Sequence, residues 1–106
     1  MNAFIDLLGA SGASYRFRAW PEAGQAPIAG NFAVVVKVGR AIEVLMLGVT
    51  YDLSRASAQA ASAGLIGKPL FVRLNIARTT RRHEHDDLVA GYAPPLVFDT
   101  GSEAPT

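Results

Sequence analysis

The sequence predicts an α+β domain in which helices pack on a small, mostly antiparallel sheet, and three observations carry that prediction. The chain has 106 residues, 50% of them hydrophobic, and no cysteine, so it can build one apolar core but no disulfide or cysteine-bound zinc site. Residues 31–38 and 41–47 are rich in β-branched residues and flank a short turn, as in a β-hairpin. Residues 53–63 carry small apolar side chains at helical spacing.

Two short elements are expected before the hairpin. We expect residues 1–13 to form an N-terminal helix and a link, because Asn2 is a capping residue type and the apolar residues after it end at Gly9. Residues 14–20 alternate between aromatic and basic side chains, which is typical of a half-buried strand, and Pro21 ends it.

The hairpin and the helix after it form the expected centre of the domain. Both strands of the hairpin are almost continuously apolar, which predicts a position covered on both faces of the sheet. Asp52 can cap the helix over residues 53–63, and the small residues on its inner face predict close packing on the sheet.

A further strand and helix are expected toward the C-terminus. Residues 70–77 alternate as a strand does, and Thr79 or Thr80 can cap a helix over about residues 81–91. The prolines at 94–95 prevent that helix from continuing. Domain organisation is therefore one domain over residues 14–98, preceded by the N-terminal helix and followed by a disordered tail over residues 99–106.

Charge is distributed unevenly along the chain. Residues 1–82 hold all ten Lys and Arg and four of the nine acidic residues, and residues 83–106 hold the other five acidic residues. The basic part is a candidate contact for the phosphates of DNA or RNA, although scattered surface charge is an equally good interpretation. The candidate nucleic-acid-binding residues are the arginines of this part that surround the expected strands and the last helix: Arg16, Arg18, Arg73, Arg78, Arg81 and Arg82.

Several spaced motifs resemble the GIY-YIG endonuclease domain. The hairpin opens with GNF at 30–32 and closes with MLG at 46–48, VTYDLSRA opens the next helix, and HEHDDLVAGYAPPL ends the match. In that family the hairpin carries Gly-Ile-Tyr and Tyr-Ile-Gly, and the last helix is followed by a Pro-Pro-Leu segment. The resemblance covers about residues 14–97 and implies the fold predicted above.

The resemblance implies a site built from two tyrosines, an arginine and a glutamate that holds one divalent metal ion. Phe32 stands at the first tyrosine and Met46 at the second. The arginine falls on Ala56, one residue after Arg55. The implied site positions are therefore all altered or shifted: Phe32, Met46, Arg55, Glu84 and His85.

The last helix holds the most ambiguous of these positions. The metal-binding glutamate of the family falls on His85, and Glu84 precedes it by one residue. His85 shares the apolar face of this helix with Leu88 and Val89, so a hydrogen-bonded core histidine is its simpler interpretation.

Three functions follow as hypotheses. The first is a catalytically impaired GIY-YIG-like domain that binds nucleic acid, with no metal ligand and no cofactor. The second is an active nuclease that uses Arg55 and Glu84 with Mg²⁺. The third is a protein-interaction module or homodimer that docks through the apolar N-terminal helix. No apolar run approaches the ~20 residues needed to cross a bilayer, and Asp6 interrupts the first one, so we expect a cytoplasmic protein without membrane contact.

Overall fold

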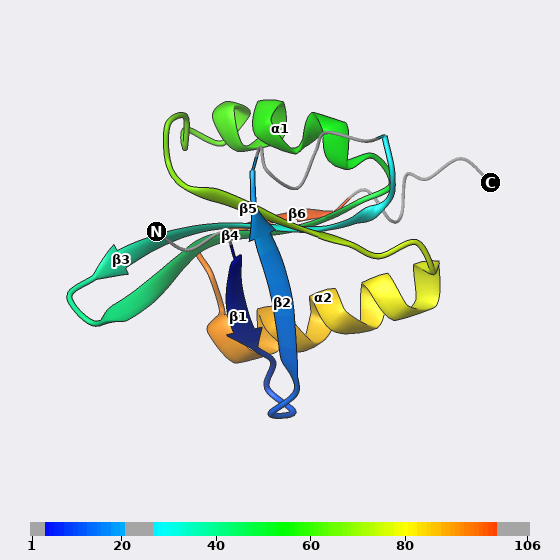
Figure 1. Cartoon of the computed structure of the whole chain (residues 1–106), viewed down its shortest axis with the longest axis horizontal. Coiled ribbons are helices and arrows are strands. Elements are labelled where there is room, and N and C mark those ends of the chain that lie inside the picture. Colours follow the sequence, from blue (N-terminus) through cyan, green and yellow to red (C-terminus); the bar gives the residue numbers. More distant parts are fainter. Residues whose placement is uncertain (1–3, 21–26, 100–106) are drawn as a thin grey trace.

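The computed structural model describes residues 4–20 and 27–99. Within them the chain forms one curled six-stranded sheet, with α1 on one face and α2 on the other (Figure 1). The elements in chain order are β1 (Phe4–Leu8), β2 (Ser14–Ala19), β3 (Gly30–Val38), β4 (Ala41–Thr50), the 3-10 turn η1 (Leu53–Arg55), α1 (Ala56–Ser62), β5 (Leu70–Leu74), α2 (Arg78–Tyr92) and β6 (Leu96–Asp99).

The sheet has the strand order β1-β2-β5-β3-β4-β6. The first four neighbouring pairs are antiparallel, whereas β6 lies parallel to β4. Strands and helices are therefore combined as predicted, but the prediction of a small, mostly antiparallel sheet is corrected to a six-stranded mixed sheet. No helix among the described residues has the length and apolarity needed to span a bilayer.

The β3–β4 hairpin lies at the centre of the sheet, and both of its faces are covered as predicted except at its tip, where residues 37–43 are exposed. Phe32 and Val34 pack on the side of α1, while Ala33 and Val35 pack on the side of α2. The turn at Gly39 has a positive φ of 65°, which glycine adopts without steric cost. Alternating side chains of one strand thus serve two separate cores.

The α1 side is closely packed because its residues are small. Ala56 and Ala60 are buried on the inner face of α1, and Gly48 of β4 lies directly under the Phe32 ring. Asp52 caps η1 as predicted, since its carboxylate accepts a hydrogen bond from the Ser54 backbone N–H at 3.0 Å.

Helix α2 begins earlier than the expected residue 81. It starts at Arg78 with Ala77 in the capping position, and no side chain caps it, so the prediction of a Thr79 or Thr80 cap is wrong. The helix ends at Tyr92, where Ala93 adopts a left-handed conformation before the prolines. Leu88 is its most deeply buried apolar residue.

The predicted N-terminal helix is wrong, because residues 4–8 form strand β1 of the same sheet; Asn2 lies outside the described residues. Leu7 is opposite Tyr15 of β2, and both side chains are buried in the core on the α2 side. A five-residue segment with four apolar residues fits a helix or a strand, and here pairing with β2 decides for the strand. Residues 4–13 therefore form a strand and a turn instead of the predicted helix and link.

Strand β6 has no counterpart in the sequence prediction. Its residues Leu96 and Phe98 pack on the α1 side, and it runs beside β4 with Leu96 opposite Met46. Asp99 is part of this strand and not of a tail; the rest of the expected tail, residues 100–106, lies outside the described residues.

Candidate functional site

The site positions implied by the family resemblance lie on two opposite faces of the sheet. Phe32 and Met46 belong to the core under α1, and Arg55 is exposed where η1 meets α1. Glu84 and His85 lie on the inner side of α2, on the other face. The fold therefore brings the first three positions together and separates them from the last two.

A groove of about 400 Å³ lies between α1 and β6 on the first of these faces. We call it the α1–β6 groove. The described residues that line it come from α1 with its preceding turn, from β4 and from the segment 96–98: Met46, Arg55, Ala58, Gln59, Ser62, Ala63, Leu96, Val97 and Phe98.

The floor of the α1–β6 groove is apolar. Phe32 is fully buried beneath it, and its ring centroid lies 5.9 Å from that of Phe98, which lines the groove. Met46 is also buried there. At the two positions where the family carries tyrosines, this chain therefore has no hydroxyl group.

The polar groups of the groove come from α1. Arg55 and Gln59 are one helical turn apart and both line the groove. Within residues 4–20 and 27–99, the Arg55 guanidinium has no hydrogen-bond or ion-pair partner. The Gln59 side-chain oxygen Oε1 is buried and also has no partner, alone among the buried side-chain N and O atoms of the described residues.

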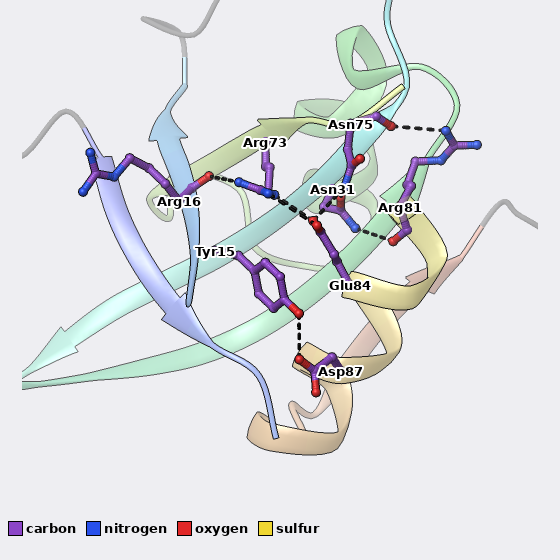
Figure 2. A network of polar contacts seen from close by, with 8 residues as sticks. All are labelled: Tyr15, Arg16, Asn31, Arg73, Asn75, Arg81, Glu84 and Asp87. Atoms are coloured by element: carbon purple, nitrogen blue, oxygen red, sulfur yellow. Dashed lines mark hydrogen bonds and ion pairs between the residues drawn. The ribbon is translucent and has the colours of Figure 1, made fainter. Parts of the chain in front are cut away.

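On the opposite face of the sheet, polar side chains form a hydrogen-bonded network that joins α2 to the strands (Figure 2). Its centre is Glu84, which is buried. Arg73 of β5 donates to both carboxylate oxygens of Glu84, with Nε–Oε1 at 2.8 Å and Nη2–Oε2 at 3.4 Å. Asn75 donates to Glu84 Oε1 at 2.7 Å and to Asn31 Oδ1 at 3.0 Å. The carboxylate of Glu84 is therefore fully engaged within the chain.

Arg81 extends this network along α2. It is buried, and its Nη1 donates to the backbone carbonyls of Asn75 and Ile76 at 3.2 and 2.8 Å. Its own carbonyl accepts from Asn31 Nδ2 at 3.1 Å. Burial lowers the pKa of the Arg81 guanidinium from its ordinary value. Arg81 thus ties the start of α2 to β5, and it is withdrawn from solvent.

Asp87 closes the other end of the same face. Tyr15 donates its hydroxyl to Asp87 Oδ2 at 2.7 Å, and Ser11 donates both its hydroxyl and its backbone N–H. The hydrogen bonds from Ser11, followed by the one from Tyr15, lower the pKa of Asp87. The same carboxylate raises the pKa of Tyr15. These bonds anchor the β1–β2 turn to α2.

His85 is buried on the inner side of α2. Burial lowers the pKa of His85, and the nearby carboxylates of Asp99 and Asp86 oppose that shift only in part. This burial agrees with the core position expected for His85, whereas its hydrogen bond stays a prediction. Among the described residues, no group of three or more His, Asp or Glu side chains is placed to hold a metal ion.

Most of the predicted nucleic-acid-binding arginines have partners within the chain. Arg73 and Arg81 are engaged as described above. Arg16 pairs with Asp6 at 2.9 Å and stacks on the Phe4 ring, and Arg82 pairs with Asp99 at 2.8 Å rather than with a residue of its own helix. The carboxylate of Asp99 raises the pKa of Arg82. Arg78 is exposed at the start of α2 and also interacts within the chain.

Arg18 is the exception among these six arginines. It is exposed on β2, and in the described part of the chain its side chain has no hydrogen-bond or ion-pair partner. It lines a second hollow, of about 280 Å³, on the face of the sheet that α1 partly covers. We call this the β2–β5 hollow; its lining residues are Arg16, Arg18, Val72, Arg73 and Leu74.

Comparison with known proteins identifies no relative. Protein-family models, curated sequences and solved structures all gave no match to this chain.

Sequence analysis missed two parts of the α1–β6 groove, namely the residues of β6 and Gln59. Leu96 and Phe98 could not be assigned to it, because the segment after the prolines was not predicted as a strand. Gln59 did carry a signal, since its four-residue spacing from Arg55 puts both side chains on one side of a helix.

Proposed function

We propose that this chain is a GIY-YIG-like domain that binds nucleic acid through the face of the sheet carrying α1 and does not cleave it. The resemblance stays part of the proposal because its motifs fall on β3, β4, η1 and α2. The observation that carries the proposal is that Arg18 and Arg55, on the face that carries α1, have no partner among the described residues. The arginines of the α2 face have partners within the chain, and on the α1 face Arg16 is paired as well, with Asp6.

Two unpartnered arginines belong to the proposed binding face. Arg18 lies on β2 opposite Val72, whose side chain packs under α1, so Arg18 lies on that same face of the sheet. Arg55 lies at the α1–β6 groove. The acidic residues of α2 belong to the other face, where Glu84 and Asp87 are held by hydrogen bonds. The binding face therefore keeps free guanidinium groups for phosphate.

Absence of cleavage follows from the chemistry of the α1–β6 groove. None of the described residues that line it is a carboxylate, a histidine or a tyrosine. Arg55 and Glu84, the pair required for the alternative nuclease, lie on opposite faces, and Glu84 is bound by Arg73 and Asn75. The groove thus offers a phosphate contact but no general base and no metal ligand.

The test is a fluorescence-anisotropy titration with labelled single strands and duplexes at several salt concentrations. The double variant Arg18→Ala/Arg55→Ala should bind at least tenfold more weakly at low salt. Its plot of log affinity against log salt should flatten by about 1.4 for single strands, because each lost phosphate contact removes about 0.7 from the slope. The oligonucleotide recovered after incubation with Mg²⁺ should be intact.

The matched control is Lys37→Ala/Arg40→Ala, which removes the same charge from the exposed tip of the β3–β4 hairpin. It should leave both the affinity and the slope close to those of the unmodified chain. Equal losses in the two double variants would mean that net charge alone drives binding, and the proposed face would be wrong. Metal-dependent cleavage that disappears in Glu84→Ala would favour the nuclease instead.

A further inference from the structure

We propose that the α1–β6 groove is a base-reading site that takes one adenine nucleotide, with Gln59 as the residue that selects the base. This inference rests on the proposed function where the adenine belongs to a bound single strand. The groove, its free polar groups and its apolar floor each contribute to the argument.

Gln59 supplies the first step. A buried oxygen without a hydrogen-bond partner costs about 1–3 kcal/mol, so a ligand that supplies a donor gains from satisfying it. The terminal torsion of glutamine is soft, which lets the amide turn toward a ligand in the groove. A glutamine amide pairs in bidentate fashion with adenine, because its oxygen accepts from the N6 amino group and its nitrogen donates to N7.

Arg55 supplies the second step. It precedes Gln59 by one turn of helix, so the two side chains are offset by about 6 Å along the helix axis. Both line the α1–β6 groove, and Arg55 is exposed and free to contact an anion. A nucleotide has this arrangement of groups: a base edge at one end and a phosphate at the other. Guanidinium is well suited to bind that phosphate.

The floor of the groove supplies the third step. Met46, Leu96 and Phe98 provide apolar and aromatic surface beside the amide of Gln59. Stacking of a base on an aromatic side chain contributes about 1–3 kcal/mol in single-strand-binding proteins. The groove volume of about 400 Å³ lies within the range of about 300–1,000 Å³ that is usual for small-molecule sites.

The adenine could come from a strand or from a free nucleotide, and the experiment separates the two sources. Binding of oligo(dA), oligo(dC) and oligo(dT) of equal length is measured by anisotropy, and binding of AMP, GMP, CMP and UMP is followed by NMR shifts of groove residues. The unmodified chain should prefer oligo(dA) about tenfold and should shift Phe98 and Gln59 resonances most with AMP.

The deciding variant is Gln59→Leu, which keeps the side-chain size and removes both amide groups. It should abolish the preference for oligo(dA) while leaving the salt slope unchanged, because phosphate contacts do not specify sequence. Ser57→Ala, which alters an exposed residue of the same helix that does not line the groove, should keep the preference. Since Gln59→Leu also removes a buried unsatisfied oxygen, its unfolding midpoint should not fall, which excludes misfolding as the cause.

The outcomes for the inference and for the proposed function are distinct. Equal binding of all three oligonucleotides, or a preference that survives in Gln59→Leu, overturns the base-reading site while nucleic-acid binding stands. AMP shifts that are lost in Gln59→Leu, without binding of any strand, overturn the proposed function and support a site for free adenine nucleotide. Absence of both kinds of binding overturns both proposals.

Discussion

The two faces of the sheet use polar residues in opposite ways. Under α2, Arg73, Glu84 and Arg81 are joined to Asn31 and Asn75 by hydrogen bonds that leave the central carboxylate fully occupied. On the α1 face, the guanidinium groups at positions 18 and 55 and a buried amide oxygen have no partner among the described residues. The same residue types thus serve stability on one face and stay available for ligands on the other.

Side-chain size explains why the groove lies on the α1 face. Helix α1 has only seven residues and packs through Ala56 and Ala60, so its outer residues leave space above β6. Helix α2 has fifteen residues and presents the long side chains of Arg81, Glu84 and His85 to the sheet. These long side chains fill the space, and those of Arg81 and Glu84 form hydrogen bonds there, which alanine side chains cannot do.

The largest expected loss of stability comes from removing Glu84, the centre of the polar network under α2. Glu84→Ala leaves Arg73 and Asn75 without their acceptor in a mostly buried position, so the free energy of unfolding should fall by roughly 3 kcal/mol. Urea unfolding should show a lower midpoint at nearly constant m-value. Nucleic-acid affinity, measured where the variant is still folded, should not fall.

Asp86→Ala is the matched control, because Asp86 is exposed on the same helix. Its effect should stay within about 0.5 kcal/mol. If Asp86→Ala destabilised the chain as much as Glu84→Ala does, the loss would reflect the helix charge and not the network.

On the α1 face, the free energy of unfolding should depend on side-chain packing and not on buried charges. Gly48→Ala places a Cβ atom on the Phe32 ring, which is itself confined by Phe98, so the free energy of unfolding should fall by about 1–3 kcal/mol. Adding Phe32→Leu should restore part of this loss, because the smaller side chain yields space to the new methyl group. Additive losses in the double variant, measured by urea unfolding, would contradict the packing argument.

The sequence predicted the elements whose signals are local. Alternation in residues 14–20, the β-branched hairpin strands and the Asp52 cap each depend on neighbours in the chain, and the structure has strand β2, strands β3 and β4 and turn η1 there. The helix predicted for the N-terminal segment failed, because the four apolar residues of Phe4–Leu8 fit either a helix or a strand, and pairing with β2 decided for the strand. Strand β6 was missed because its parallel partner β4 is distant in sequence.

The site was less predictable than the fold, because it too depends on contacts between residues that are distant in sequence. Phe32, Met46 and Arg55 were singled out by motif position, and the fold does bring them to one face. Whether an arginine is paired within the chain depends on partners that are not neighbours in sequence: Glu84 for Arg73, and Asp99 for Arg82. Without those contacts, paired and free arginines look alike, so five arginines with internal partners were counted as binding residues.

The smallest expected effect is a pH dependence confined to the α2 face, where burial lowers the pKa of His85. A lowered pKa means that the unfolded chain binds the proton more readily than the folded chain does. Stability should therefore be highest above the unfolded pKa of about 6.5 and should fall as the pH drops through it, by at most about 1.4 kcal/mol per pH unit. The lowered pKa of Asp87 acts only below its ordinary value of 3.8, so it does not enter this window.

Urea unfolding of the unmodified chain and of His85→Gln between about pH 8 and pH 5 measures this difference. The His85→Gln variant should lose most of the pH dependence, since glutamine does not titrate. His83→Gln should keep it, because His83 is exposed on the same helix. Gly48→Ala should also keep the full slope, since its packing defect lies on the α1 face and leaves His85 buried under α2. Parallel pH profiles for the unmodified chain and His85→Gln would show that burial of this histidine does not couple folding to protonation.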